Sequence, residues 1–361
     1  MPSIAKENFV FLQVNKLNIA MILQQIKRIS FVVVIILILM GALVSWMTFT
    51  PICKNAEATY IYIDSDDDID SIYTKINAHA RPMQMAGFKM LTCITGYGEI
   101  VKTGKFEMGN GLSTLDVLRN LRNKHQVPVR LVVPSVRTLE RLVAKLDNWI
   151  EPDSAALITY LRNDSICQTY GYTRETMSCL FIPNTYEVFW DITPEQLVKR
   201  MKKESDRFWT KERKEKAKTQ GLTPNEAITL ASIVDQETAN NGEKPAIAGM
   251  YLNRLRKGML LQADPTVKFA LQQFALRRIL HEHLMVDSPY NTYRYKGLPP
   301  GPIAIPAISS IEAVLNAEQN DYLYMCAKED FSGTHNFAAT YGEHLRNARK
   351  YTQALDKRGI K

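Results

Sequence analysis

One stretch of this chain constrains everything around it, because it has no charged residue. Residues 29–53 lack Asp, Glu, Lys and Arg, and the middle of the stretch is FVVVIILILMGALVSWM. A helix needs about 20 mainly apolar residues to cross the hydrocarbon core of a bilayer. The sequence therefore predicts a transmembrane helix over residues 29–50.

The charges that flank this stretch predict its orientation. Lys27 and Arg28 precede it directly, whereas the other flank begins with a single lysine, Lys54. An excess of positive charge marks the cytoplasmic side, so residues 1–28 are predicted to be a short cytoplasmic tail. A cleaved signal peptide is the alternative, but the apolar run is too long for one and no A-x-A site follows it. Translation from Met21 would keep the basic flank and the anchor.

Composition limits the remaining possibilities. The 361 residues carry a net charge of +8 that is spread along the chain, which disfavours nucleic acid and leaves an anionic polymer or a membrane surface as partners. Five cysteines occur without a CxxC pair and are interpreted as mostly buried free thiols. The sequence HEH at 281–283 lacks the i,i+4 spacing of a helical zinc site, so no metal is predicted.

The part after the anchor is predicted to be an α+β protein with two regions. Residues 58–134 contain short segments typical of strands (60–64, 104–108 and 127–133) between short helices, which indicates a small α+β module. Residues 135–220 are predicted to be mainly helical, except for FIPNTYEVFW at 181–190. Because only the anchor needs lipid, a chain that begins near Asn55 is expected to fold in solution.

A helix is predicted from Pro224 onward with clear start and stop signals. Thr223 and Glu226 form a capping box around Pro224, and Asn240-Asn241-Gly242 supplies the stop. At about 100° per residue, two faces result. One face is apolar except for its last member: Ala227, Leu230, Ile233, Val234 and Glu237. The other is polar: Thr229, Ser232, Asp235 and Gln236.

The two acids of this helix are therefore predicted to differ. Asp235 lies on the polar face, where a solvated carboxylate needs no explanation. Glu237 lies on the apolar face, and apolar surroundings raise the pKa of a carboxyl group, as a general acid requires. In the alternative interpretation, Glu237 reaches solvent at the helix end or pairs with Arg254 or Arg256.

A series of motifs in fixed order resembles the MltG (YceG-like) family of endolytic murein transglycosylases over residues 58–350. The motifs are TGKFEMGNGLS, FIPNTYEVFW, LASIVDQETA, NRLRKGMLLQADPTV, YNTYRYKGLPPGPIAIP and GTHNFAATYGEH. The resemblance implies a LysM-like module at 58–134, which grips glycan, and a YceG-like catalytic domain at 135–361. Two departures stand out: Asp235 replaces a glutamate that is common in the family, and residues 269–287 do not follow the family pattern.

The resemblance implies a lyase with a single catalytic glutamate, Glu237, and no metal or cofactor. Its substrate is the glycan strand of peptidoglycan, and it acts beside peptidoglycan synthases on the outer side of the cytoplasmic membrane. The motifs also offer candidate substrate-binding side chains: Asn291, Thr292, Tyr293, Gln262, Asp264, Thr266 and His335.

Two other classes of function remain open. The chain is an anchored glycan-binding scaffold if Glu237 is inert. Relatives have also been described as aminodeoxychorismate lyase, a pyridoxal-phosphate activity. The sequence shows no Gly-rich phosphate loop beside a candidate Schiff-base lysine, which counts against that activity.

Overall fold

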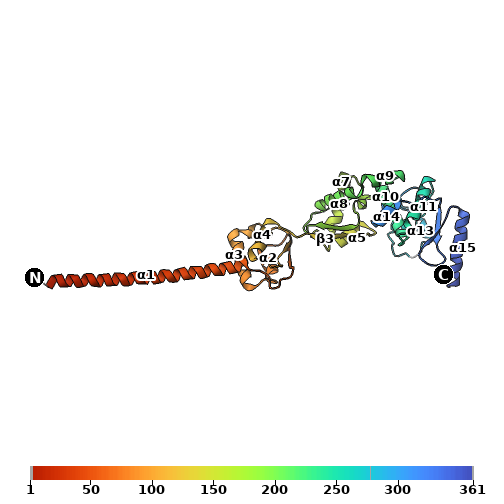
Figure 1. The fold of residues 1–361 in the computed structure, drawn as a ribbon. Coiled ribbons are helices and arrows are strands. Elements are labelled where there is room, and N and C mark those ends of the chain that lie inside the picture. The colour runs from red at the N-terminus through yellow and green to blue at the C-terminus, as the bar shows by residue number, and fades with distance from the viewer. Residues whose placement is uncertain (1–2, 277, 360–361) are drawn as a thin grey trace. The chain divides into compact units, whose positions relative to one another are not determined.

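The computed structural model describes residues 3–276 and 278–359, and the chain divides into two compact units, Met1–Val127 and Pro128–Lys361 (Figure 1). Helices and small antiparallel two-stranded sheets occur in both units. The fold is therefore mixed α+β, as predicted from the sequence.

The first unit combines the N-terminal helix with a small α+β module. Its elements are α1 (Ser3–Phe49), β1 (Tyr60–Ile63), α2 (Ile69–Asn77), α3 (Pro82–Thr95), η1 (Tyr97–Glu99), β2 (Gly104–Glu107) and α4 (Thr114–Asn123). Strands β1 and β2 pair antiparallel, with Ile61 opposite Phe106. Both of these side chains are buried in one core with Ile72, Ile76 and Leu121, so the predicted strands at 60–64 and 104–108 and the short helices of this region are confirmed.

Helix α1 contains the predicted apolar segment. Its part Met21–Phe49 has 29 residues and a mean hydropathy of 2.8, and none of its most apolar window is buried inside the protein (Figure 1). By length and composition this helix is able to cross a membrane.

The end of α1 belongs to the core of the first unit. Ile52 and Cys53 follow the helix and are buried, and the backbone N–H of Ile52 donates to the carbonyl of Leu112 at 3.1 Å. Gly87 on α3 lies very close to the end of α1: a Cβ atom at this position would be 2.8 Å from the carbonyl oxygen of Met47. A chain that begins near Asn55 would lack these core residues, so its folding in solution stays a prediction that a start before Ile52 would favour.

The second unit carries the remaining elements. They are β3 (Val129–Val133), α5 (Leu139–Leu146), α6 (Ser154–Leu161), α7 (Asp164–Thr169), η2 (Met177–Leu180), β4 (Asn184–Val188), α8 (Pro194–Phe208), α9 (Lys211–Thr219), α10 (Pro224–Glu237), α11 (Lys244–Arg256), α12 (Asp264–Ala270), α13 (His281–Leu284), α14 (Ile308–Leu315), β5 (Tyr324–Ala327), β6 (His335–Ala338) and α15 (Tyr341–Lys357). Strand β3 pairs with β4, with Leu131 opposite Tyr186, and so lies in this unit rather than in the small module.

Helix α10 lies at the centre of the second unit. It packs against α11, α12 and α14, and every residue from Ala227 to Val234 is buried. The prediction that the polar face of α10 is exposed to solvent is wrong, because Thr229 and Ser232 on that face are buried as well. Their hydroxyls donate to the carbonyls of Asn225 at 2.8 Å and of Thr229 at 2.7 Å, so these polar groups are satisfied inside the helix.

Candidate active site

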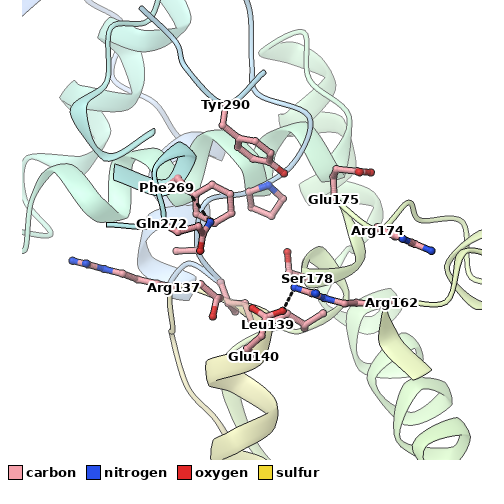
Figure 2. A pocket seen from close by; sticks show the side chains of 14 residues that line it. Arg137, Leu139, Glu140, Arg162, Arg174, Glu175, Ser178, Phe269, Gln272 and Tyr290 are labelled. Atoms are coloured by element: carbon pink, nitrogen blue, oxygen red, sulfur yellow. Dashed lines mark hydrogen bonds and ion pairs between the residues drawn. The ribbon is translucent and has the colours of Figure 1, made fainter. Parts of the chain in front are cut away.

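The second unit has a cavity of about 550 Å³ that contains none of the predicted site residues (Figure 2). Arginines and glutamates line it together with aromatic rings. The ring centroids of Phe269 and Tyr290 are 4.7 Å apart, and Arg162 forms an ion pair with Glu140. This cavity is larger than the one that contains the predicted catalytic residue, Glu237.

A second cavity, of about 240 Å³, contains Glu237. Its walls come from α10, α11, the segment before α12, and strand β5. The residues that line it are Glu237, Met250, Tyr251, Arg254, Leu261, Gln262, Asp264, Tyr293, Met325, Cys326, Ala327 and His335. Four of the predicted substrate-binding residues therefore share a cavity with the predicted catalytic glutamate.

The local sequence explains why Glu237 lies in this cavity. Thr223 and Glu226 form the predicted capping box at the start of α10, with Pro224 in the first turn. The helix ends at Glu237 itself, because Thr238 is already extended at φ −143°. As the last helical residue, Glu237 leaves the packed part of α10 and reaches the cavity.

The carboxyl group of Glu237 has a neutral hydrogen-bond partner. The hydroxyl of Tyr251, on α11, donates to Glu237 Oε1 at 2.5 Å. Burial raises the pKa of Glu237 to about 7, and the charge of Asp264 also raises it, while the Tyr251 hydrogen bond and the charges of Lys268 and Arg254 lower it. A carboxyl group with this pKa can donate and accept a proton near neutral pH.

The alternative partners of Glu237 have other contacts. Arg254 Nε donates to the carbonyl of Leu323 at 2.6 Å, and its Nη1 donates to the carbonyl of Leu261 at 2.9 Å. Arg256 donates to Gln220 Oε1 at 2.8 Å. Arg254 thus lines the cavity while it holds two backbone segments in place.

Asp235 is not a solvated carboxylate, and that expectation is corrected. Lys244 Nζ lies 3.0 Å from Asp235 Oδ1, and these two side chains are only 6% and 10% exposed. Ser310 also donates to Oδ1, and Ser135 donates to Oδ2 at 3.4 Å. Burial of the pair follows from the packing of α10 against α11 and α14, which the helical periodicity of α10 alone does not contain.

The predicted binding residues Asp264, Tyr293 and Gln262 lie in the cavity. The hydroxyl of Tyr293 donates to Asp264 Oδ1 at 2.6 Å. Gln262 has a positive φ of 53°, and its backbone N–H donates to the carbonyl of Thr292 at 3.1 Å. These contacts connect the start of α12 and the segment before it to the loop at residues 290–293.

The predicted binding residues Asn291, Thr292 and Thr266 are buried instead of lining the cavity. Asn291 Nδ2 donates to the carbonyls of Leu284 at 2.9 Å and Val286 at 2.8 Å. The hydroxyls of Thr266 and Thr292 are 2.8 Å apart. In this structure the three side chains hold the loop that presents Tyr293.

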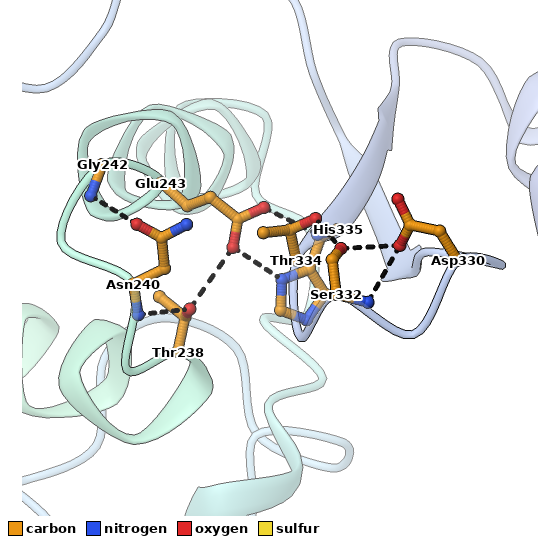
Figure 3. Close-up of polar contacts among 8 residues, drawn as sticks. All are labelled: Thr238, Asn240, Gly242, Glu243, Asp330, Ser332, Thr334 and His335. Carbon is orange, nitrogen blue, oxygen red and sulfur yellow. Dashed lines mark hydrogen bonds and ion pairs between the residues drawn. The ribbon is translucent and has the colours of Figure 1, made fainter.

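His335 also lines this cavity, and it lies on the hairpin of β5 and β6 (Figure 3). Its backbone N–H donates to Glu243 Oε1 at 2.6 Å, and its Nδ1 lies 3.3 Å from Glu243 Oε2. Thr238 donates to the same carboxylate at 3.3 Å. Glu243 therefore ties the segment that follows Glu237 to the hairpin.

Sequence reasoning missed Tyr251, Arg254 as a cavity residue, and Glu243. Arg254 falls within the motif NRLRKGMLLQADPTV, so its position in a shared motif was a usable signal. Tyr251 is buried, with the surroundings expected of a core aromatic residue, and Glu243 follows a loop. No local pattern distinguishes these two from ordinary structural residues.

Comparison with known proteins shows the family of the chain. The YceG-like family profile matches residues 61–350, so the chain belongs to the YceG-like family. It is 36% identical over 168 residues to an endolytic murein transglycosylase of Bacillus subtilis, which covers 46% of each chain. It is 27% identical over 286 residues to one of Streptococcus pneumoniae, which covers 70% of this chain and 51% of the relative. The chain thus spans about half the length of these relatives.

A solved structure shares the fold. The crystal structure of a putative YceG-like protein from Listeria monocytogenes superposes with a TM-score of 0.53 at 28% identity, covering 81% of this chain and 99% of that one.

Proposed function

We propose that this protein is a lyase, an endolytic murein transglycosylase that cleaves glycan strands of peptidoglycan between N-acetylmuramic acid and N-acetylglucosamine. The observation that carries the proposal is the position of Glu237: a carboxyl group with a pKa of about 7 at the wall of a cavity, in a chain of the YceG-like family. The names of the Bacillus and Streptococcus relatives support it.

In the proposed mechanism one carboxyl group acts twice. Protonated Glu237 donates its proton to the glycosidic oxygen as the bond to C1 of the muramic sugar breaks. The resulting carboxylate accepts the proton of the C6 hydroxyl of the same sugar, whose oxygen attacks C1. The product is a 1,6-anhydro end, and no water is consumed. Because the nucleophile is intramolecular, its effective concentration is high and a second catalytic carboxylate is unnecessary.

The neighbours of Glu237 suit this proton cycle. Burial raises the pKa of Tyr251 well above its usual value, so its hydroxyl stays protonated and keeps donating to Glu237. Tyr293 and Asp264 present a phenol and a carboxylate at the same cavity, where they would contact sugar hydroxyls. The buried residues Asn291 and Thr292 fix the loop that carries Tyr293.

Hydrolysis is the second candidate, and Asp264 is the observation that favours it. A glycosidase that uses water needs a second carboxylate as base or nucleophile. Asp264 lines the same cavity, and its charge contributes to the raised pKa of Glu237.

Mass spectrometry of the fragments released from purified peptidoglycan distinguishes the two reactions. The proposed transglycosylase gives muramic ends that are one water lighter than reducing ends. Reducing ends as the main product would overturn it in favour of hydrolysis, and Asp264→Asn would then abolish release. No released fragments at all would leave a glycan-binding scaffold.

The location also belongs to the proposal. Helix α1 would anchor the chain in the cytoplasmic membrane with residues 1–28 in the cytoplasm, and the catalytic domain would act outside on nascent strands beside peptidoglycan synthases, limiting strand length. A reporter that is active only in the cytoplasm, fused after Lys361, should be inactive. An active reporter would contradict this topology.

A further inference from the structure

A small basic recess lies beside the cavity of Glu237. Its volume is about 40 Å³, and the residues that line it are Arg137, Gln236, Pro265, Lys268, Phe274 and Ile303. Gln236 directly precedes Glu237 in α10, and Lys268 lies on α12, whose first residue, Asp264, lines the cavity of Glu237. The charge of Lys268 lowers the pKa of Glu237, which shows that the recess and the cavity are electrostatic neighbours.

Among the described residues, the two positive charges of this recess form no ion pair. Arg137 Nε donates to Gln236 Oε1 at 3.0 Å, and its Nη1 donates to the carbonyl of Phe274 at 3.0 Å, so both acceptors are neutral. Within residues 3–276 and 278–359, neither Arg137 nor Lys268 is a member of an ion pair. A guanidinium group has five N–H donors in a fixed fork suited to carboxylates, and only part of that capacity is used here.

The neighbouring arginines of the larger cavity are different. Arg162 pairs with Glu140, and Arg174 Nε lies 2.6 Å from Asp164 Oδ1. Their charges are compensated by the protein itself. Arg137 extends away from these side chains in Figure 2. The uncompensated positive charge is therefore concentrated at the recess rather than spread over the larger cavity.

The recess connects the two cavities. Arg137 lines both the recess and the 550 Å³ cavity. Along α12, Asp264 lines the cavity of Glu237, Lys268 lines the recess, and Phe269 lines the larger cavity. From Asp264 to Phe269 the helix rises by about 7–8 Å. A short substituent on a sugar held at Glu237 is therefore long enough to reach the larger cavity.

We propose, on the basis of the proposed function, that Arg137 and Lys268 bind a carboxylate carried by a substituent of the glycan strand at Glu237, and that the larger cavity holds the rest of this substituent. In peptidoglycan the lactyl group of muramic acid carries a peptide with carboxylates of its own. Once the peptide is removed, the lactyl group has a free carboxylate. The recess is suited to a carboxylate from either source.

Binding without turnover tests this proposal. Full-length protein with Glu237→Gln is measured in detergent with strands that carry peptides and with strands stripped by an amidase. Arg137→Ala and Lys268→Ala, each added to this background, should weaken binding about tenfold or more, as expected for the loss of a charge-assisted hydrogen bond. Arg141→Ala is the matched control, because its guanidinium lies 5.6 Å from the same Phe274 ring without lining the recess.

The two kinds of strand identify the source of the carboxylate. A loss confined to peptide-bearing strands assigns it to the peptide, and a loss on stripped strands assigns it to the lactyl group. Unchanged binding of the Lys268→Ala and Arg137→Ala proteins, or an equal loss with Arg141→Ala, would overturn the proposal. Failure of the proposed function has a separate signature, since wild-type protein would then release either no fragments or fragments with reducing ends from both kinds of strand.

Discussion

Asp235 and Glu237 lie two residues apart at the end of α10, yet their surroundings are different in kind. Asp235 is paired with the buried cation of Lys244 and accepts a hydrogen bond from Ser310. Glu237 accepts its hydrogen bond from the neutral phenol of Tyr251, and burial raises its pKa to about 7. The comparison teaches that the partner decides the role of a buried carboxyl group. A cation makes it part of the scaffold, whereas a neutral donor leaves it a proton to exchange.

The largest expected effect is the loss of activity in Glu237→Gln. Glutamine keeps the shape and accepts the Tyr251 hydrogen bond, but it cannot transfer a proton. Loss of a general acid typically costs about 10²–10⁴-fold in rate, and in the proposed mechanism the same group also acts as base. Fragment release from peptidoglycan measures the effect, with thermal melting as the control for folding. Substantial activity in a folded Glu237→Gln protein would show that the catalytic group lies elsewhere.

Asp235→Asn should instead destabilise the fold. It leaves the ammonium group of Lys244 buried without a counter-charge, and breaking a buried pair in this way typically costs about 3–5 kcal/mol. Urea unfolding measures the free energy. Adding Lys244→Met should restore much of the loss, because no buried charge then remains unpaired. If Asp235→Asn is as stable as the wild type, the ion pair contributes nothing.

The raised pKa of Glu237 makes stability depend on pH in a defined direction. Its folded value is about 7 against an ordinary value of 4.5, so between these values the folded chain binds more protons than the unfolded chain. This contribution is present in full below about pH 4.5 and is lost as the pH rises to about 7. Glu237→Gln cannot show this loss. Relative to wild type, its stability should increase between pH 5 and pH 8 by at most about 3 kcal/mol. A constant difference over that range would contradict the raised pKa.

The smallest effect is expected from Tyr251→Phe. The Tyr251 hydrogen bond lowers the pKa of Glu237, so its removal should raise that pKa further. A general acid works while protonated, and its activity falls as the pH exceeds its pKa. The alkaline limb of the rate profile should therefore move to higher pH in the variant. An unmoved limb would mean that Tyr251 only packs against Glu237, and a limb at lower pH would contradict the assigned sign.

The sequence predicted the start of α10 and the position of Glu237 because both depend on local features. Capping residues and a helical period are properties of neighbouring residues, and Thr223, Pro224 and Glu226 behave as expected. The environment of Asp235 was missed because Lys244 and Ser310 reach it through tertiary packing. Which residue of α11 contacts Glu237, Tyr251 or one of the arginines, depends on how α10 and α11 pack against each other, and no single-helix pattern contains that information.

The module at the N-terminus was predicted in its elements but not in its limits. Strand β3 has the composition of the strands before it, so nothing local shows that it pairs with β4 more than fifty residues later. The LysM-like character of this module stays a prediction. The same holds for substrate contacts of Asn291, Thr292 and Thr266, whose polarity suggested binding, while the structure uses their hydrogen bonds to hold a loop.

The joint between α1 and the small α+β module of the first unit has a mechanical consequence. The chain passes from the helix into the core of that unit through Ile52 and Cys53, with Met47 in contact with Gly87, and no slack segment separates them. A helix fixed in this way cannot rotate independently of the module to which it is attached. Spanning helices tilt to match the thickness of the bilayer. If α1 spans the membrane as proposed, any such tilt turns the module with it, and lipid thickness sets the angle of this module to the membrane surface.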